Sequence, residues 1–525
     1  MFRSRAFSDT ASPATTRRRN ARFARSRAFF PSPVHSERVG AMPDWLPLVR
    51  SYLEPYAGGI SSDNVLEAQQ WASNASSYTA VGSWTAKLVS GYVWVKPIHL
   101  HYSWQERAGV LRILMLAARA ARDAGQPLPD SELVYASADA DPTVAHGCKR
   151  SKRRGACAPL PVFVNARNAQ KKSSAIPVPE FTWVGTSSAP PWCHTEASIS
   201  QAASEQRWSE RDDRAYFSGG LSTGRSRQAL RDLGETQKDV LLVRDVGFSS
   251  TGSLGRWQKK QESKLQARQK HVRVRGVHPA RACKHKYLIS VPGFGYASRL
   301  RQLLACGAVV LHVVHASEEF YTPLLRDGVH VVRLDGGDGP GGGPTALRSV
   351  SHSLLRVLKQ LRANTTYGHR LALAASAFAR TWLSFPAVVD YARTLLQEYG
   401  TLFKSPVVIS AGDGYAQLQS EADLLVAMKL CNCVDDSYGQ SCIRQVGAGE
   451  SFAGTWSDKQ GKVLFRRECF NTFRGRRHKL RQLAQQQRCC PLKPSAAGIG
   501  FCWEARCCDG WNCQKPLDCP QTASV

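Results

Sequence analysis

The sequence predicts a mixed α/β protein that is followed by a cysteine-rich C-terminal module. The chain has 525 residues, 43% of them hydrophobic, so it is long enough to bury more than one core. Amphipathic helical segments alternate with short apolar strand segments from about residue 43 to residue 404, which is the pattern of βαβ units. Eleven of the 16 cysteines come after residue 430, which sets the tail apart in composition.

The chain is strongly basic but does not have the motifs of common nucleic-acid-binding folds. Its 70 Lys and Arg against 41 Asp and Glu give a formal charge of +29, so a basic nucleic-acid-binding protein has to be considered. No RNP-type aromatic motif, C2H2 spacing or helix-turn-helix signature accompanies the charge, so nucleic acid is not the expected partner and stays an alternative. The mean hydropathy is −0.31 and no apolar run reaches about 18 residues, so no transmembrane segment is expected.

Residues 1–42 are predicted to be a basic disordered leader. Eight arginines and a single acidic residue, Asp9, lie among the first 30 residues, with Ser, Thr and Ala between them. An Arg-rich, acid-poor start is typical of an organelle transit peptide, whereas a secretory signal would need an apolar stretch that is absent. A solvated tail or a wrongly chosen start codon explains the same composition.

The first mixed segment is expected to form a domain over residues 43–215. Residues 61–73 fit a helix that begins at Ser61 or Ser62, residues 91–98 fit a strand, and residues 103–125 fit a long amphipathic helix that ends near Gly125. Residues 128–142 then predict a strand that runs into an acidic turn, the pattern of a βαβ unit whose strand edge faces a ligand crevice. Residues 143–175 are basic and polar and are expected to be an inserted loop.

The second mixed segment is expected to form a domain over residues 216–404. Strands are predicted at 239–248, 286–293, 308–314 and 329–334. Helices are predicted at 296–307, 351–364 and 378–403, and Gly293 and Gly295 stand between a strand and a helix.

The remaining residues, 405–525, are expected to be a cysteine-rich module. Their cysteine density with intervening loop-forming residues is typical of a small disulfide-linked fold. Zinc is the competing interpretation, but no paired CxxC motifs at zinc-ribbon spacing occur and His478 is the only histidine among these cysteines. Disulfides are therefore favoured over metal.

Residues 283–332 carry a pattern that resembles the CAP10 domain of glycosyltransferase family 90. The segment reads CKHKYLISVPGFGYASRLRQLLACGAVVLHVVHASEEFYTPLLRDGVHVV, and the family pattern is Cys-Lys-x-Lys-Tyr-Leu, an Arg-bearing helix that ends in Cys-Gly, a strand, and Glu-x-Phe-Tyr before Val-His. Three further segments agree in order, IPVPEFTW at 176–183, RDDRAYFSGGLSTGRSRQAL at 211–230 and LPDSELVYASADADP at 128–142. The resemblance covers about residues 45–400 and neither end of the chain.

The resemblance implies a GT-B-like fold, two Rossmann-like domains that face each other across a cleft. It also implies an inverting enzyme that moves glucose or xylose from UDP-glucose or UDP-xylose to a hydroxyl of a protein or glycan acceptor. The UDP-sugar is a co-substrate, and no metal or other cofactor is obligatory, because such enzymes neutralise the leaving diphosphate with helix N-termini and basic side chains.

The same resemblance puts the catalytic base at Asp139, seven residues after Glu132. Asp141 precedes Pro142 directly and is the nearest rival. Without the resemblance, the Asp-Ala-Asp sequence also fits the DxD metal motif of another transferase class or a simple Asx turn before proline, and these alternatives stay open.

Arg299 matches the family arginine that contacts the UDP diphosphate. A glycine-containing loop that leads into a helix presents backbone N–H groups to phosphate, and an arginine adds a bidentate donor pair. The chain departs from the family pattern at Leu221, where relatives have an arginine, so Arg225 or Arg227 would have to supply the charge. This departure keeps open a catalytically inactive, glycan-binding relative. The donor-binding candidates are Gly219, Thr223, Arg227, Gly295, Ala297, Ser298, Arg299 and Glu318.

Three aromatic residues are candidates for stacking on a sugar or acceptor, namely Trp183, Tyr216 and Phe217, with core packing as the commoner fate of such side chains. Tyr287 and His330 are expected in the core. Cys283 and Cys306 match positions that the family pairs in a disulfide.

Asn74 and Asn364 begin N-glycosylation sequons. Together with the cysteines they favour the lumen of the secretory pathway, the endoplasmic reticulum or the Golgi. The Arg-rich leader favours an organelle instead.

Overall fold

The computed structural model describes residues 42–74, 83–99, 104–137, 159–169, 173–185, 191–246, 278–293, 295–334, 344–410, 412–419, 423–424 and 427. The predicted leader, except for Met42, and the cysteines of the predicted C-terminal module lie outside these residues. Within them the chain is a mixed α/β protein with two main sheets, as the sequence predicts.

The first sheet has six strands and mixed directions. Its order is β13-β2-β1-β3-β4-β6, with bounds β1 (Ser83–Val89), β2 (Tyr92–His99), β3 (Ser131–Ala136), β4 (Val162–Val164), β6 (Ile176–Pro177) and β13 (Ala416–Leu418). A two-residue turn joins β1 to β2, and both its residues, Ser90 and Gly91, have positive φ of 52° and 75°. The predicted βαβ unit is present as β2, α3 (Trp104–Asp123) and β3. However, β1 lies between the two strands and is antiparallel to both.

Two expectations about the first half are wrong in their boundaries. The basic segment 143–175 is not simply an inserted loop, because it contains β4 and the short strand β5 (Arg167–Asn168). The predicted start of the cysteine-rich module at residue 405 separates β13 from a sheet to which it belongs, since Ala416–Leu418 pairs with β2. Strands of two or three residues are too short to give a periodic signal in the sequence.

The second sheet has five parallel strands in the order β12-β10-β9-β7-β8. Their bounds are β7 (Asp212–Gly219), β8 (Leu241–Asp245), β9 (His285–Ser290), β10 (Val309–Val313) and β12 (Val332–Leu334). The expected domain boundary at 215/216 falls inside β7 and is therefore misplaced. Because β8 lies on one side of β7 and β9 on the other, the strand order reverses at β7, which makes a topological switch point between β7 and β9.

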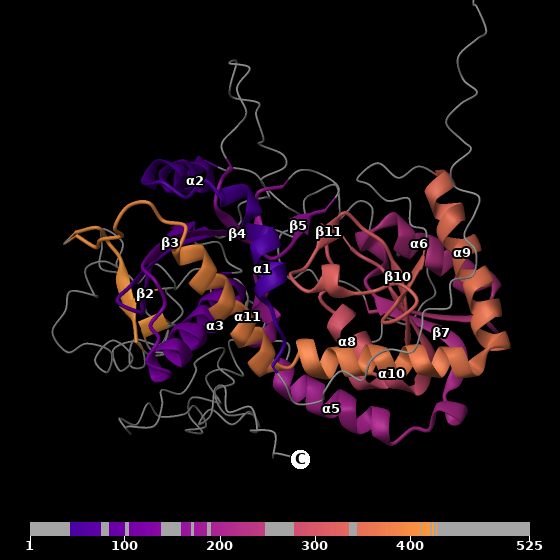
Figure 1. Ribbon diagram of the computed structural model, residues 1–525. Helices are drawn as coiled ribbons and strands as arrows, with labels where there is room; N and C mark the ends of the chain where they lie inside the picture. Colours follow the sequence, from indigo (N-terminus) through magenta and orange to yellow (C-terminus); the bar gives the residue numbers. More distant parts are fainter. Residues whose placement is uncertain are drawn as a thin grey trace, which may run out of the picture. The chain divides into compact units, whose positions relative to one another are not determined.

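Helices cover these sheets, as Figure 1 shows. Helix α6 packs against α9 beside the second sheet, whereas α11 packs against α3 and α1 beside the first. The helices are α1 (Leu46–Leu53), α2 (Ser62–Asn74), α3, α5 (Trp192–Ser204), α6 (Arg225–Thr236), α8 (Leu300–Ala305), α9 (Pro344–Ala363), α10 (Thr365–Trp382) and α11 (Phe385–Gly400). Short 3₁₀ turns are η1 (Glu54–Tyr56), η3 (Phe181–Trp183), η4 (Trp208–Glu210), η5 (Leu221–Thr223), η6 (Pro279–Lys284) and η7 (Thr322–Leu324).

The predicted helix at 378–403 is two helices, α10 and α11, that meet at Leu383 and Ser384. Pro386 stands in the first turn of α11, where its missing N–H costs no helical hydrogen bond, but it could not lie inside a continuous helix. Among the described residues no single helix is long and apolar enough to cross a membrane, and only the bent pair of α10 and α11 meets that test by length and composition.

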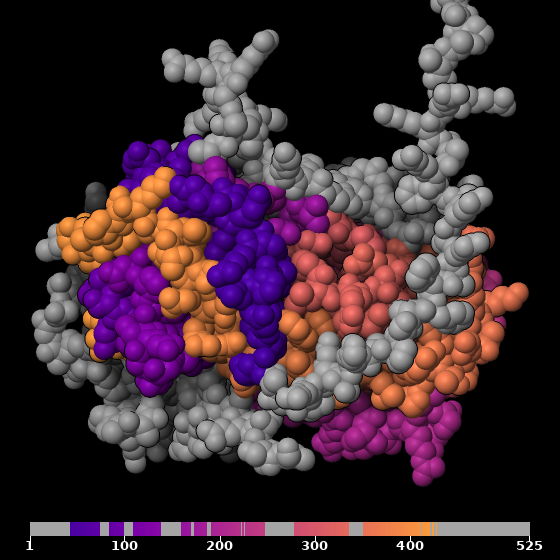
Figure 2. Space-filling model, viewed as in Figure 1, coloured from indigo at the N-terminus to yellow at the C-terminus, as the bar shows by residue number. Residues whose placement is uncertain are grey.

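One large apolar cluster joins residues of both sheets. Trp45, which precedes α1, packs edge-on against Tyr391 of α11 and lies 5.8 Å from the ring of Phe320, which follows β11 (Ser317–Glu318). The Tyr52 hydroxyl of α1 donates to the Phe320 carbonyl at 2.7 Å. In Figure 2 the indigo surface of α1 accordingly adjoins the salmon residues of the second half. Strands β5 and β11 also pair with each other.

Candidate functional site

The candidate site lies at the carboxyl ends of β7 and β9, where the strand order of the second sheet reverses. Loops that follow the two strands carry Gly219 and Gly220 on one side and Pro292 and Gly293 on the other. In open α/β sheets ligands bind in the crevice at such a reversal. Most donor-binding candidates predicted from the sequence lie in or next to these two loops, with Arg227 in the helix that follows the first loop and Glu318 on the short strand β11.

Arg227 joins the two loops with most of its hydrogen-bond donors. Its guanidinium donates to the carbonyls of Gly220, Val291 and Pro292 at 3.0 to 3.1 Å and to the Thr223 hydroxyl at 2.6 Å. Burial, with a smaller effect of the nearby Arg299, lowers the pKa of Arg227 to about 9. Because four of its five N–H groups already donate to protein oxygens, Arg227 shapes the crevice and has little left to offer a phosphate.

Arg299 enters the same crevice but makes no hydrogen bond or ion pair with its side chain to any other residue in the described part of the chain. Its guanidinium carbon lies 4.7 Å from the ring centroid of Phe217 on β7. Desolvation by burial lowers its pKa to about 10. A desolvated cation without a protein counter-charge is a strong attractor for an anion.

Gly219 is required for this placement of Arg299. A Cβ atom built on Gly219 would stand 2.4 Å from both terminal nitrogens of Arg299, closer than any real contact. The strand end therefore lets the guanidinium lie directly against its backbone. Gly293 is similar on a smaller scale, since a Cβ there would stand 3.2 Å from Arg227 Nη2.

Helix α8 begins later than expected and is short. Arg299 is its N-cap, so Ala297 and Ser298 precede the helix, and α8 has only six residues. Gly295 is buried in the loop between β9 and α8. Ala297, together with Tyr296 and Leu300, lines a pocket of about 80 Å³. Its other walls come from Pro292, from the end of β10, from residues 317–325 and from Arg333.

Glu318 lines this pocket too, so the structure brings it next to Ala297. Its carboxylate also lies 3.8 Å from Arg167 Nε of β5, the strand that pairs with β11. Burial raises the pKa of Glu318, while Arg167 and Arg333 act in the opposite direction. Glu318 is thus placed both to meet a ligand in the pocket and to tie the two halves of the chain.

The loop after β7 presents backbone rather than charge. Leu221 is buried, and its N–H donates to the Asp245 carboxylate at the end of β8 at 3.3 Å. Thr223 is buried as well and donates to the Gly220 carbonyl at 3.0 Å. The charge missing at Leu221 is therefore not replaced by Arg227, which is engaged as described above.

The three aromatic candidates pack in the interior. Trp183 and Phe217 are fully buried, and Tyr216 is 5% exposed and stacks on His285 with ring centroids 4.5 Å apart. These positions agree with core packing, the alternative to sugar stacking. Phe217 still contributes to the site, because the Arg299 guanidinium lies over its ring. Tyr287 and His330 are buried, as expected.

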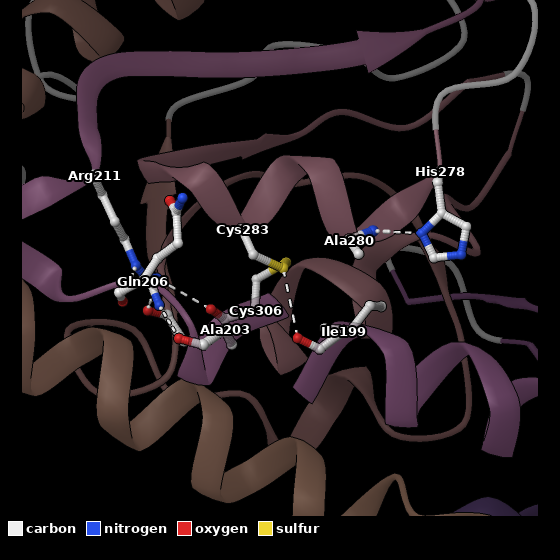
Figure 3. Close-up of a disulfide and its surroundings, with 9 residues drawn as sticks. Ile199, Ala203, Gln206, Arg211, His278, Ala280, Cys283 and Cys306 are labelled. Carbon is white, nitrogen blue, oxygen red and sulfur yellow. Dashed lines mark hydrogen bonds between the residues drawn. A yellow bond between two sulfur atoms is a disulfide. The ribbon is translucent and has the colours of Figure 1, made fainter. Parts of the chain in front are cut away.

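Cys283 and Cys306 form a disulfide with a Cα–Cα distance of 4.8 Å. Figure 3 shows it between η6 and the end of α8, with Ile199 of α5 beside it. Arg211 donates to the Cys306 carbonyl at 3.1 Å and to the Ala203 carbonyl at 3.0 Å, so the end of α8 is tied to α5 as well.

Both base candidates, Asp139 and Asp141, lie outside the described residues, whose nearest stretch ends at Ser137 after β3. The sequence alone had given no role to Arg301, Glu180 or Glu319, three buried charged residues next to the pocket. Glu180 lies 121 residues before Arg301 in the sequence, so no local sequence pattern indicates that the two side chains interact. Within the described segments no three His, Cys, Asp or Glu side chains are grouped so as to hold a metal ion.

The fold and the site together define an α/β protein with a desolvated arginine at the switch point of a parallel sheet. The sequence profile described as glycosyl transferase family 90 matches residues 42–438, three quarters of the chain, and the chain belongs to this family. It is a glycosyltransferase by family.

Curated proteins that are similar to this chain at low sequence identity also have glycosyltransferase names. The chain is 25% identical to protein O-glucosyltransferase 1 of Homo sapiens over 267 residues, 49% of this chain and 61% of the human protein. It is 23% identical to the O-glucosyltransferase rumi homolog of Aedes aegypti over 218 residues, 41% of this chain and 48% of the mosquito protein. The matches therefore span about half to three fifths of the length of these relatives.

Proposed function

We propose that the protein is an inverting glycosyltransferase that transfers glucose or xylose from UDP-glucose or UDP-xylose to a hydroxyl of a protein or glycan acceptor. The observation that carries the donor assignment is Arg299, a desolvated guanidinium at the switch point of the second sheet with no counter-charge among the described residues. A diphosphate supplies the two negative oxygens that a guanidinium fork binds best. The relatives with O-glucosyltransferase names support glucose over other sugars.

The proposal includes a GT-B-like arrangement in which two Rossmann-like halves face a cleft and a cysteine-rich module follows. The parallel second sheet with its switch point supports a Rossmann-like donor half. The first sheet has the βαβ unit β2-α3-β3 with an antiparallel strand between the two parallel ones, so its likeness to a Rossmann half is only partial.

In the proposed reaction a carboxylate takes the proton of the acceptor hydroxyl while that oxygen displaces UDP from the anomeric carbon in line. We assign this base to Asp139, with Asp141 as its rival, because both directly follow β3, a central strand of the first sheet. Arg299 binds the diphosphate and compensates the charge that builds up on the leaving group. Arg227 and Thr223 hold the two loops that present backbone to it. The proposal needs no obligatory metal.

Leu221 supports a second candidate, a catalytically inactive relative that binds glycans. Leu221 gives the loop after β7 no charge, and Arg227 already uses four of its five N–H groups within the protein. A basic nucleic-acid-binding protein is the third and weakest alternative. It requires salt-dependent binding of RNA or DNA that disappears when residues 1–30 are deleted.

For the location we propose the lumen of the endoplasmic reticulum or the Golgi. The buried Cys283–Cys306 disulfide and the exposed sequon at Asn364 support an oxidising, glycosylating compartment. The alternative is an organelle reached through the Arg-rich leader, and fractionation of cells that express the full chain decides between the two.

The test is a donor screen with the purified full chain that measures UDP release from UDP-glucose, UDP-xylose, UDP-glucuronate and UDP-galactose. We expect release with the first or second donor, lost in Asp139→Asn and retained in Asp141→Asn. An unchanged rate in Asp139→Asn would refute the assignment of the base, and strict dependence on added manganese would favour the metal interpretation of the two aspartates. UDP binding without any turnover would favour the inactive relative.

A further inference from the structure

Arg301, on the first turn of α8, lies two residues beyond the N-cap Arg299 and points the other way. Successive side chains turn by about 100° around a helix, so residues two apart leave it on nearly opposite sides. Arg299 lies against β7, whereas Arg301 is 2% exposed and lies against the η3 segment that follows the first sheet. The start of α8 is thus held between the two halves of the chain by two arginines.

Arg301 is held by a buried ionic cluster. Its Nη1 donates to Glu180 Oε1 at 2.7 Å, and its Nη2 donates to the Thr182 hydroxyl. Glu180 is 1% exposed and also accepts the Thr182 backbone N–H at 3.0 Å, so it caps η3. The guanidinium carbon lies 4.2 Å from the ring centroid of Trp183 and 5.3 Å from that of Trp192.

Glu319 completes the cluster from the wall of the pocket. It is 2% exposed, accepts the Tyr321 hydroxyl at 3.2 Å and interacts electrostatically with Arg301 and Glu180. One of its carboxyl oxygens, Oε1, and the Nε of Arg301 have no hydrogen-bond partner among the described residues. The cluster therefore reaches from η3, through the first turn of α8, to the pocket that Ala297 and Glu318 line.

A buried ion cluster of this kind contributes little net stability, because desolvation offsets the attraction of the charges. What it does well is to fix one arrangement, since a displaced guanidinium would leave buried carboxylates without a partner. At this location the arrangement that it fixes is the rotation and position of the first turn of α8. That turn begins at Arg299.

We propose that Arg301 is a positioning residue for the donor site, and that the cluster Glu180–Arg301–Glu319 holds Arg299 over Phe217 and Gly219. This inference rests on the proposed function, because the ligand assigned to Arg299 is the diphosphate of a UDP-sugar. The cluster acts through Arg299 and touches no phosphate itself. Its loss should weaken donor binding without removing the fold.

The experiment uses the full chain with the double variant Arg301→Met/Glu180→Gln, which removes the charge pair without leaving either partner buried alone. Arg301→Lys keeps the charge but loses the planar fork, and Arg356→Met on the exposed face of α9 is the matched control. UDP affinity is measured by calorimetry, and KM and kcat for the donor are measured where turnover is found. Thermal unfolding shows which variants fold.

We expect the folded double variant and Arg301→Lys to bind UDP about tenfold more weakly than the parent, with a raised donor KM and a lowered kcat, because Arg299 also compensates the charge on the leaving group. Arg356→Met should bind as the parent does. A folded double variant with parental UDP affinity and KM would overturn the proposal.

Hydrogen exchange separates this proposal from the proposed function. If the parent binds no UDP, the assignment of the donor fails, and the exchange of the amides at 299–305 then tests the cluster alone. Faster exchange of these amides in the double variant than in Arg356→Met supports the positioning role of Arg301. Equal exchange refutes it.

Discussion

The guanidinium of Arg299 occupies the space that a side chain at Gly219 would fill, 2.4 Å from the position of its Cβ. This relationship couples a backbone position on β7 to the cation that we assign to the donor diphosphate. A change at either residue should therefore have the same functional consequence, although only one of them carries charge.

Gly219→Ala should weaken UDP binding by displacing Arg299. Charge-assisted hydrogen bonds contribute about 1.5 to 3 kcal/mol, so we expect a loss of roughly 10- to 100-fold in affinity, close to that of Arg299→Ala. Calorimetric titration with UDP measures both variants. The control is Gly58→Ala, because a Cβ there meets no atom within 4 Å, and equal affinities of Gly219→Ala and the parent would contradict the contact.

The two arginines of the crevice should differ in their effect on stability. Arg227→Met leaves the carbonyls of Val291 and Pro292 without their donor, so we expect the free energy of unfolding to fall by about 2 to 4 kcal/mol. Arg299→Met removes a desolvated cation that makes no hydrogen bond to the described residues, so we expect unchanged or higher stability. Denaturant unfolding of the two variants measures the contrast, and a large loss in Arg299→Met would show that Arg299 is structural.

Glu319 should make stability depend on pH. Burial raises its pKa from 4.5 to about 8 against the opposing charge of Arg301, with Glu180 adding to the rise. Between these values the unfolded chain releases a proton that the folded protein retains, so stability falls as the pH rises, by at most about 1.4 kcal/mol per pH unit.

The substitution Glu319→Gln should remove this contribution. We expect the melting temperature of Glu319→Gln minus that of the parent to increase from pH 5 to pH 8. Glu196 has a pKa raised to about 8 by burial as well, so Glu196→Gln should show the same trend independently. A difference between Glu319→Gln and the parent that is constant across this range would argue against a buried, protonated Glu319.

The sequence predicts well what repeats along the chain and poorly what depends on distant contacts. The long helix α3 and the apolar strands β9 and β10 have clear periodicity, so they are predicted within a few residues. The predicted start of α9 is seven residues late, and α11 is merged with the end of α10 in one predicted helix. Strands β4, β6 and β13 have two or three residues each and exist only through pairing with neighbours. Even β1 is marked only by the Ser90-Gly91 turn that follows it.

The same division holds for the site. Arg299 is predicted from a motif within 50 residues, and the structure places it at the switch point. Arg227 belongs to a matching segment too. Only the structure shows that its guanidinium donates hydrogen bonds to three carbonyls from two separate loops. The partner of Arg301, Glu180, lies 121 residues away, so no local pattern could indicate the pair.

Asn364 combines a helix cap with a sequon, and the two roles use different atoms. Its Oδ1 accepts the Tyr367 N–H at 3.0 Å as the N-cap of α10, which leaves the amide nitrogen for a glycan. Asn364, Thr365 and Thr366 are all exposed. We therefore expect Asn364→Asp to lose the glycan and keep the cap, whereas Asn364→Ala loses both and about 1 kcal/mol of stability.

Full chain from a secretory host, with and without glycosidase treatment, shows by its mass whether Asn364 is modified. Thr366→Ala should abolish the modification at this position, and Thr366→Ser should keep it. Asn74→Gln removes the other sequon, so the mass of this variant reports modification at Asn364 without that at Asn74. A glycosidase-sensitive mass that persists in the combined Asn74→Gln/Asn364→Asp variant would place the modification elsewhere, and its complete absence from the parent would favour the organelle over the secretory lumen.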